Sequence, residues 1–411
     1  MNIWIFNHYA VPMEYYPHGR PHWFAKYLAE KGHKVTVFAA STVHNSDKNL
    51  IQGKKAYIVH NIGNVQYVYI RTTTYTGNGV KRVWNMVEYM LGLLRNYKNF
   101  EKPDCILAMS VHPLACVAGI RLAKKYKCRC VVDIADLWPE SFIEYGILKK
   151  NSLLLKLLYQ GEKWIYKKAD AIVFTFEGGK KYIKEKGWAR GINPKKIYHI
   201  NNGVDLEEFE YNKEHFQIQD EDLENEDIFK VVYTGSIRKV YNLEMLVLCA
   251  EELSKENPVI KFLIWGDGTE KEKLEKKVKN LHLKNIVFKG KVEKRYIPYI
   301  LSKADVNLMH WQQTSLSRYG CSLNKLFEYL AAGKLIVSDV KNNYDLLKRY
   351  DCGIVIEKQG IAELKQILLK CLLMEEKEKE KYKKNVENCV ENYDFKALTN
   401  KLEKILEDTE K

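Results

Sequence analysis

Residues 1–40, MNIWIFNHYAVPMEYYPHGRPHWFAKYLAEKGHKVTVFAA, contain the pattern that decides the fold. Asn2–Phe6 is apolar and typical of a strand, and Pro21–Lys31 has helical spacing. After Gly32, the run Lys34–Ala40 is β-branched and apolar enough to be buried on both faces. A strand, a helix and a second strand in this order predict a parallel sheet covered by helices.

The same alternation continues along the chain in two series. The first series adds the apolar runs Cys105–Met109, Val131–Ile134 and Ala171–Thr175. The second series consists of Lys230–Thr234, Lys261–Trp265, Asn285–Phe288, Val306–Met309 and Leu335–Val337. Residues 206–228, between the two series, are acidic and lack a buried run, which indicates a linker.

We therefore predict an α/β protein with two doubly wound, Rossmann-like domains that face each other across a cleft. The first domain is expected to span residues 1–205 and the second residues 206–393. An amphipathic helix at about 394–411 is expected to pack back on the first domain. Because sheets of this kind bind ligands outside the carboxyl ends of their strands, we look for functional residues there.

Charge is distributed unevenly between the two halves of the chain. Residues 1–205 contain 31 Lys and Arg against 15 Asp and Glu, a balance of +16, whereas the remainder contains 35 against 37, a balance of −2. A general bias towards lysine would be expected to load both halves. The imbalance therefore favours an anionic partner for the first half.

Other features of the composition point to the compartment. No segment approaches the ~18–20 uninterrupted apolar residues that a membrane span needs. The N-terminal segment is expected to form a strand and not a secretion signal. Nine scattered cysteines, with Cys128-Arg129-Cys130 as the only close pair, indicate free thiols in a reducing cytoplasm.

Several motifs in a fixed order resemble glycosyltransferase family 4, especially its bacterial members that build O-antigens, lipopolysaccharide and capsules. These motifs are DIADLWPESFIEYGIL (133–148), ADAIVFTFE (169–177), INNGVDLEEF (200–209), YTGSIRKVYNLEML (233–246), FLIWGDGTE (262–270), FKGKV (288–292), ADVNLM (304–309) and SLNKLFEYLAAGKLIV (322–337). The resemblance covers nearly the whole chain. It implies the GT-B fold, a retaining reaction without a metal ion, a nucleotide-sugar donor in the second domain and an acceptor bound mainly by the first.

The helix that begins after Ser322 is the part of the donor site that we predict most firmly. By resemblance, Glu328 holds the ribose of the nucleotide, and a carboxylate can accept hydrogen bonds from two vicinal hydroxyls. Asn324 and Lys325 lie at the start of this helix, where unpaired N–H groups and the dipole favour phosphate. The alternatives are a solvated glutamate and a surface lysine.

Loops that follow strands supply the other donor-site candidates. Gly235 lets the backbone approach a ligand, and the resemblance places diphosphate-binding cations in the same loop. Ser236 stands where relatives commonly have arginine, so we assign this role to Arg238 and Lys239. By resemblance, the loop of Gly266 flanks the nucleotide, and the segment Lys291-Val292 is similar to one whose backbone reads the base. An exposed basic turn is the alternative for Arg238 and Lys239.

The first domain is expected to supply the residues of the reaction centre. Gly19 and Arg20 lie in the loop after the first strand. By resemblance this loop lies close to the diphosphate, so Gly19 is a donor-binding candidate, and Arg20 is an additional cation on the acceptor side. A simple turn is the alternative. His112 follows the strand Cys105–Met109 and is assigned to catalysis, either on the acceptor or on the donor sugar. A core or helix-capping histidine is the alternative.

The motif DLWPE supplies three further candidates. Asp136 is a candidate catalytic residue that orients the acceptor hydroxyl or accepts its proton. Trp138 offers a surface for sugar stacking, or is part of the core. Glu140 is placed on the acceptor side, with capping of the following helix as the alternative.

The sequence departs from the family pattern at one position and mimics a metal motif at another. The E-x7-E pattern of the family would place its first glutamate at position 320, which here is Gly320. This departure leaves sugar recognition open. Asp220-Glu221-Asp222 spells DxD, but it lies in the acidic segment away from any predicted strand end. We interpret it as solvated charge and predict no metal site.

Residues 79–100, GVKRVWNMVEYMLGLLRNYKNF, combine apolar and basic character. The apolar residues at helical spacing are Val83, Trp84, Val87, Met90, Leu91 and Leu94, and basic residues flank them. Such a helix suits an anionic membrane surface, although packing of this stripe on the sheet is the commoner arrangement. The charge of the first half favours membrane contact.

The sequence thus predicts a cytoplasmic glycosyltransferase, peripherally bound to the inner face of the membrane. It would move a sugar from a nucleotide-sugar donor, expected to be UDP-linked, to a lipid-diphosphate-linked saccharide. A catalytically silent nucleotide-sugar-binding or scaffold protein is the main alternative. A nucleic-acid-binding protein lacks a recognised module, and a Rossmann dehydrogenase lacks GxGxxG after the first strand.

Overall fold

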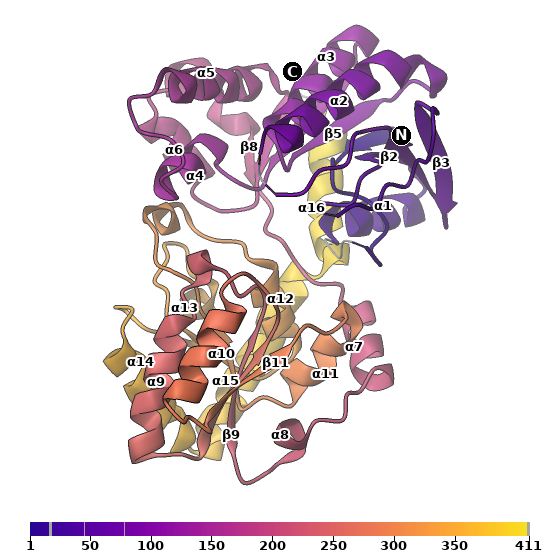
Figure 1. The fold of residues 1–411 in the computed structure, drawn as a ribbon. Helices are drawn as coiled ribbons and strands as arrows, with labels where there is room; N and C mark the ends of the chain where they lie inside the picture. Colours follow the sequence, from indigo (N-terminus) through magenta and orange to yellow (C-terminus); the bar gives the residue numbers. More distant parts are fainter. Residues whose placement is uncertain (16–18, 45, 78, 409–411) are drawn as a thin grey trace. The chain divides into compact units, whose positions relative to one another are not determined.

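An eight-stranded sheet organises the N-terminal part of the chain in the computed structural model, which describes residues 1–15, 19–44, 46–77 and 79–408 (Figure 1). Its strands are β1 (Asn2–Phe6), β2 (Lys34–Ala40), β3 (Tyr57–Ile62), β4 (Val65–Ile70), β5 (Cys105–Ser110), β6 (Arg129–Ile134), β7 (Ala171–Phe174) and β8 (Ile197–His199). They lie in the order β3-β4-β2-β1-β5-β6-β7-β8. Every pairing is parallel except that of β3 with β4.

Helices cover both faces of this sheet. They are α1 (Arg20–Glu30), α2 (Val80–Asn96), α3 (Pro113–Tyr126), α4 (Trp138–Glu144), α5 (Leu153–Lys168), α6 (Gly179–Glu185) and α16 (Phe395–Glu407). Helices α1 and α16 pack on the face that presents Ile3, Ile5 and Leu107. On the other face, α3 approaches so closely that a Cβ at Gly119 would overlap the side chain of Ala108. Helices α2 and α5 lie against α3.

The chain divides between Asn201 and Asn202, and the segment that begins at Phe395 returns to the first unit. The second unit, Asn202–Asp394, contains a six-stranded parallel sheet in the order β11-β10-β9-β12-β13-β14. Its strands are β9 (Phe229–Thr234), β10 (Ile260–Trp265), β11 (Ile286–Gly290), β12 (Val306–Met309), β13 (Leu335–Ser338) and β14 (Ile354–Val355).

Helices also cover both faces of the second sheet. They are α7 (Leu206–His215), α8 (Glu221–Glu224), α9 (Glu244–Glu256), α10 (Lys271–Asn280), α11 (Ile297–Ser302), α12 (Asn324–Ala331), α13 (Leu346–Arg349), α14 (Ile361–Leu372) and α15 (Glu376–Val390). One core cluster joins α9 and α14 to the sheet, and another joins α11, α12 and α15 to its opposite face. In each sheet the chain order reverses beside a central strand, β1 or β9, which creates a switch point at the carboxyl ends.

The strands predicted from buried apolar runs are present, with ends that differ by at most two residues. The hairpin of β3 and β4 was not predicted. Its outer strand β3 is largely exposed, so it lacks the apolar signal of the central strands. Two strands at the ends of the sheets, β8 and β14, have only three and two residues and were also missed.

The linker predicted over residues 206–228 is wrong, because this segment contains α7 and α8. The Asp205 carboxylate caps α7 by accepting from the N–H of Glu208 at 2.8 Å, and Asp220 caps α8. Acidic residues at these positions complement the helix dipole. Each helix buries only one apolar side chain, Phe209 or Leu223, so the sequence shows little periodicity.

The DxD aspartates in this segment are not solvated as predicted. Lys289 Nζ lies 2.7 Å from carboxylate oxygens of both Asp220 and Asp222, and Lys261 Nζ lies 2.5 Å from Asp222. These ion pairs are largely shielded from solvent and tie α8 to β10 and β11. They draw down the pKa of the Asp222 carboxyl against the opposing effect of its burial.

Two properties of the chain bear on its surroundings. All nine cysteines are free thiols. None of the helices within the described residues combines the length and apolarity needed to cross a bilayer.

Candidate functional site

Three glycine-containing loops lie together at the carboxyl ends of β9, β10 and β11. The N–H of Gly235 donates to Trp265 O at 2.9 Å, and the N–H of Gly266 donates to Gly290 O at 2.8 Å. Gly266 has φ +149°, and a Cβ there would overlap the carbonyl oxygen of Gly235. A Cβ at Gly268 would likewise overlap Ile237 O. Glycine is therefore required for the loops to close on one another.

Helix α12 is anchored to the end of β9. The Tyr329 hydroxyl accepts a hydrogen bond from the N–H of Thr234 at 2.9 Å, and Phe327 and Leu330 are buried in the core. This anchoring brings the first turn of α12 beside the Gly235 loop. The predicted donor elements, the glycine loop and the helix N-terminus, are thus neighbours within one unit.

Lys325 is the side chain that defines the site. Its Nζ is buried and has no hydrogen-bond partner among the residues that the structure describes. It lies 4.1 Å from the ring centroid of Tyr233 and 4.8 Å from that of Tyr241. A Cβ at Gly235 would be 3.1 Å from this nitrogen. Burial lowers the pKa of Lys325 to about 7.

An ammonium group held in this way is unusual. Burying a charge without a counter-ion is costly, and aromatic faces compensate only in part. The surface lysine considered as an alternative is therefore excluded. The arrangement of Lys325, the Gly235 backbone and the N-terminus of α12 is suited to an anion.

Glu328 lies one turn further along α12 and is not a free carboxylate. It forms an ion pair with Lys294, and its side chain is 15% exposed whereas that of Lys294 is 46% exposed. The solvated glutamate considered as an alternative is therefore wrong. Lys294 was missed because it follows β11 at some distance, beyond the segment Lys291-Val292 to which the sequence analysis assigned the role of this loop. A ligand that hydrogen-bonds to Glu328 must displace Lys294 or share the carboxylate with it.

A buried histidine at the end of β12 was also missed. His310 Nδ1 lies 2.6 Å from Asp339 Oδ2, and its Nε2 lies 3.1 Å from Asn242 O. Both ionisable side chains are fully buried. This pair fixes the loop that contains Arg238 and Lys239. Its sequence signal was a histidine directly after the strand Val306–Met309.

The remaining donor candidates lie at the surface. The Arg238 and Lys239 side chains are exposed and form no hydrogen bond or ion pair with any described residue. Asn324 and Lys291 are exposed as well, whereas Val292 is half-buried against the core. The exposure of Arg238 and Lys239 is compatible both with the predicted contact to a diphosphate and with the alternative of an exposed basic turn.

Gly320 has a backbone conformation that explains the departure from the family motif. It ends the turn Ser315–Tyr319 with φ +91° and ψ 178°, a region open in practice only to glycine. A glutamate would be strained at this position. The loop, and not only the side chain, therefore differs from the family pattern.

In the first unit, His112 lies between β5 and α3, at the switch point of the sheet. It occupies the N-cap position of α3, but its side chain does not cap the helix. The ring is fully buried, and its Nε2 lies 2.9 Å from Nδ1 of His8, which follows β1. The helix-capping alternative is therefore wrong, while burial is compatible with the alternative of a core histidine.

Arg20 is not the free cation predicted on the acceptor side. Its Nε lies 2.8 Å from Asp133 Oδ2 and its guanidinium also donates to Ile200 O and Asn201 O. The side chains of Arg20 and Asp133 are 9% and 3% exposed. Sequence could not reveal this pairing of residues 113 positions apart. Gly19 has a packing role, because a Cβ there would overlap the indole of Trp23.

The three candidates of the DLWPE segment, Asp136, Trp138 and Glu140, have different surroundings in the structure. Asp136 is exposed after β6, while the surrounding protein partly desolvates its carboxyl and raises its pKa. Trp138, half-buried at the start of α4, packs edge-on against Phe142. The alternative that Glu140 caps the following helix is wrong, because its side chain makes no capping hydrogen bond. Instead, Glu140 accepts a hydrogen bond from the Tyr159 hydroxyl at 2.6 Å and forms an ion pair with Lys186.

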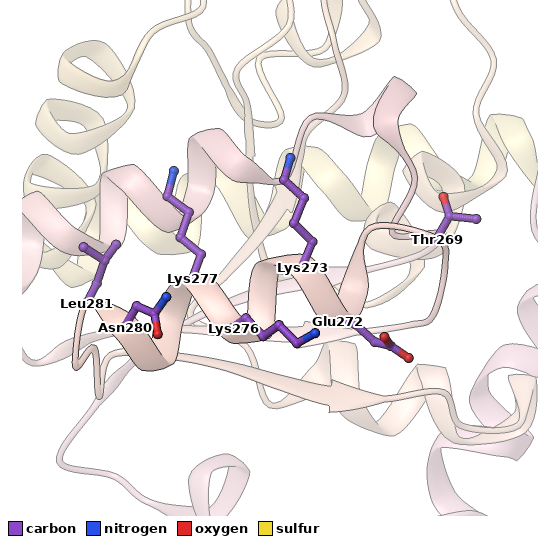
Figure 2. A pocket seen from close by; sticks show the side chains of 7 residues that line it. All are labelled: Thr269, Glu272, Lys273, Lys276, Lys277, Asn280 and Leu281. Carbon is purple, nitrogen blue, oxygen red and sulfur yellow. The ribbon is translucent and has the colours of Figure 1, made fainter.

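A hollow of about 550 Å³ along α10 lies outside this arrangement (Figure 2). Lysines line it, but two of them are already paired with Glu244, Lys277 at 2.6 Å and Lys273 at 3.5 Å. Figure 2 shows most of the lining side chains along α10, with Thr269 on the loop before it, and no convergent polar cluster. It is therefore not a candidate for the donor site.

Comparisons with known families agree with this architecture. Residues 22–208 match the model described as Glycosyltransferase Family 4, and residues 215–389 match Glycosyl transferases group 1. The chain is a glycosyltransferase of the GT-B fold. No curated protein matches its sequence.

Solved structures share the fold over nearly the whole chain. The Anabaena protein HepE in complex with UDP is 14% identical, with a TM-score of 0.66 and 99% of each chain covered. WaaG, described as a glycosyltransferase involved in lipopolysaccharide biosynthesis, is 14% identical, with a TM-score of 0.64 and coverage of 98% of this chain and 99% of its own. A structure described as trehalose-6-phosphate from E. coli, bound with UDP-2-fluoro glucose, is 10% identical, with a TM-score of 0.74 and full coverage of both chains.

Proposed function

We propose that this glycosyltransferase moves a hexose or N-acetylhexosamine from a UDP-linked donor to a lipid-diphosphate-linked saccharide, with retention of configuration, in surface polysaccharide synthesis of the capsule or O-antigen type. The second unit binds the donor and the first unit binds the acceptor. The reaction uses no metal ion and takes place at the inner face of the cell membrane.

The buried, unpaired ammonium of Lys325 is the observation that carries this proposal. It lies against the Gly235 loop and at the first turn of α12, so a diphosphate there would meet a cation and unpaired helix N–H groups together. These groups can stabilise the charge of the departing nucleotide in place of a metal ion. The UDP complexes of HepE and the UDP-2-fluoro glucose complex of the E. coli structure support UDP as the nucleotide.

Calorimetric titration with UDP tests the donor site. Lys325→Met removes the cation while retaining a side chain that can fill the space, and we expect it to abolish measurable UDP binding or weaken it at least about tenfold, the loss expected for one charge-assisted contact. Lys279→Met, on the exposed side of α10, is the matched control and should bind UDP normally. Equal UDP affinity in both variants would contradict the site.

A thermal-shift screen across UDP-, GDP- and ADP-sugars then identifies the donor. We expect a UDP-sugar to raise the melting temperature most, because bound ligand stabilises the folded state. Glu328→Ala should lose this selective shift if its carboxylate holds the ribose. Transfer to lipid-linked acceptors by the wild-type protein establishes the reaction.

The alternative of a catalytically silent protein is favoured by one observation, the backbone of Gly320. Its φ of +91° is incompatible with the first glutamate of the family motif, so the donor sugar loses that carboxylate. Donor binding without turnover against a broad acceptor panel would establish this alternative.

Exposed apolar residues in the basic first unit support contact with an anionic membrane. On α2, the buried face is formed by Asn85, Met86, Tyr89 and Leu93, whereas Val83 and Trp84 of the predicted stripe are 57% and 55% exposed. The predicted stripe therefore does not pack wholly on the sheet. This observation favours the membrane interpretation of the helix over the packing alternative.

Helix α5 presents a second surface of exposed apolar residues beside lysines, which was not predicted from the sequence. Leu153, Leu157 and Trp164 lie on one side of the helix and are exposed. Lys156, Lys163, Lys167 and Lys168 supply positive charge beside them, and the single acidic residue of α5, Glu162, is buried. Both α2 and α5 pack against α3, so they belong to one helical layer.

Cosedimentation with vesicles tests this contact. We expect the protein to bind vesicles of phosphatidylglycerol and phosphatidylcholine, with binding weakened by salt, and not vesicles of phosphatidylcholine alone. Leu153→Gln with Leu157→Gln should reduce binding. Leu373→Gln, an equally exposed leucine of the second unit, should have no effect. Binding unaffected by the α5 substitutions would contradict the role of this helix.

A further inference from the structure

A chain of hydrogen bonds fixes the protons of the two buried histidines at the switch point of the first sheet. It begins at Asn85 on the buried face of α2, whose Nδ2 donates to Thr73 O at 2.6 Å and to Thr42 Oγ1 at 2.9 Å. A backbone carbonyl only accepts hydrogen bonds, so the nitrogen of the amide must lie on this side. The amide oxygen therefore faces His8, with Oδ1 2.6 Å from His8 Nε2.

The orientation of Asn85 determines the tautomers of both rings. Because Asn85 Oδ1 can only accept, the proton of a neutral His8 lies on Nε2. Nδ1 of His8 is then a bare acceptor, and it faces His112 Nε2 at 2.9 Å. The proton of His112 must therefore lie on Nε2, which leaves Nδ1 of His112 with its lone pair.

Burial keeps both rings neutral. His8, His112 and Asn85 are fully buried, and burial lowers the pKa of His8 to about 3 and that of His112 well below its ordinary value. The positive charge of Arg82 acts in the same direction on both histidines. A doubly protonated His8, which would reverse the direction of the hydrogen bond to His112, is thereby disfavoured at neutral pH.

Another buried histidine of the same unit shows what a fully satisfied ring looks like. His22 Nε2 lies 3.0 Å from Val11 O, and its Nδ1 lies 2.8 Å from the Tyr67 hydroxyl. His112 differs, because its Nδ1 is buried without a partner among the described residues. A fully partnered core histidine does not leave a ring nitrogen in this state.

We propose that Asn85 and His8 are positioning residues that hold His112 in the Nε2–H tautomer, so that its Nδ1 accepts a hydrogen bond from a substrate hydroxyl. This assignment rests on the proposed function and specifies the chemistry at His112. A bare lone pair attracts a hydroxyl proton and repels phosphate or carboxylate oxygen. His112 orients the sugar as a neutral acceptor and does not act as a strong base.

Ring-nitrogen NMR of the full chain with ¹⁵N-labelled histidine tests the tautomers without any substrate. We expect His112 to show a protonated Nε2 and an unprotonated Nδ1 at neutral pH, with assignments from single His→Gln variants. In Asn85→Leu, His8 should no longer be confined to one tautomer, and the His112 signals should change. Asn96→Leu changes a residue of the same helix that takes no part in these hydrogen bonds, and it should leave the His112 signals unchanged. A proton on Nδ1 of wild-type His112 would overturn the proposal.

Two substitutions of His112 then separate its ring nitrogens in the transfer reaction. In His112→Asn the amide oxygen can replace Nδ1, whereas in His112→Gln the amide reaches the position of Nε2. We expect His112→Asn to retain more turnover, with His112→Gln and Asn85→Leu reduced about tenfold, the size expected for one lost hydrogen bond. Equal turnover in all three would overturn the proposal. UDP binding should be normal in all three variants, because these residues do not belong to the donor site of the second unit. Failure of the wild-type protein to bind UDP would refute the proposed function and not the role of His112.

Discussion

At the switch point of the first sheet, buried polar side chains are linked to one another and leave Nδ1 of His112 with its lone pair, whereas at that of the second sheet a buried cation, Lys325, has no hydrogen-bond partner among the described residues. Arg20 and Asp133 form a buried pair, and His8 links Asn85 to His112. In the second unit, Lys325 lies against the faces of two tyrosines, and no described residue accepts a hydrogen bond from its Nζ. Under the functions proposed above, this difference suits the first unit to a neutral, hydroxyl-bearing ligand and the second unit to an anion.

Removal of Arg20 is expected to have the largest effect on stability. Arg20→Met leaves the Asp133 carboxylate buried and unpaired, which costs about 3–5 kcal/mol of folding free energy. Urea unfolding should reveal this loss. Lys34→Met breaks an exposed ion pair with Glu101 and should change stability little. Equal behaviour of the two variants would show that the buried pair does not organise the first unit.

The charge of Lys325, unlike that of Arg20, is expected to destabilise the ligand-free protein. This effect should appear as a dependence of stability on pH. The folded pKa of Lys325, about 7, is below the ordinary 10.5, so between these values the unfolded chain binds more protons. The stability of the ligand-free protein should therefore rise above pH 7, by up to about 1.4 kcal/mol per pH unit from this group. The rise should be absent in Lys325→Met. UDP binding should weaken over the same range, because the diphosphate needs the protonated amine.

Substitution of Gly266 sharpens the view that backbone contacts shape the anion site. Gly266→Ala places a Cβ against the Gly235 carbonyl at φ +149°, and strain of this kind costs about 1–3 kcal/mol. UDP affinity should fall together with the melting temperature. Gly161→Ala, in open space on α5, should instead gain up to about 1 kcal/mol. A normal UDP affinity in Gly266→Ala would separate the loop from the site.

The smallest effect is expected at the DxD aspartates. Asp222→Asn weakens the ion pairs with Lys261 and Lys289 and should cost about 1 kcal/mol of stability, within the range for partly exposed pairs. Transfer activity should be unchanged, with or without added Mg²⁺ or Mn²⁺. Loss of activity with retained stability would indicate a metal role for this motif.

Much of the fold was predictable because the central strands are buried on both faces. Runs such as Lys34–Ala40 and Lys230–Thr234 have a signal that depends only on local sequence. The hairpin of β3 and β4 had a different signal, Gly63-Asn64 between two β-branched runs, which a search for buried runs passes over. Short helices such as α8 bury too little to show a period.

The site was predictable in location but not in electrostatics. The motif around Glu328 located the donor elements, yet the burial of Lys325 depends on Tyr233 and Tyr241, which come from elsewhere in the second unit. The partner of His112 depends on β1 and β5 being neighbours in the sheet. Whether a charge is paired or left alone is decided by such long-range contacts, and the sequence pattern around each residue does not contain them.

The return of the last helix to the first unit has a consequence for synthesis on the ribosome. Phe395, Leu398 and Leu402 of α16 are buried against the first sheet and α1, so the core of that unit is incomplete until α16 has been translated. The second unit is complete on emergence of residue 394. Domains generally fold in the order of their synthesis. Here the first unit is completed only after the second, and a fragment that stops at residue 201 would leave an apolar face uncovered.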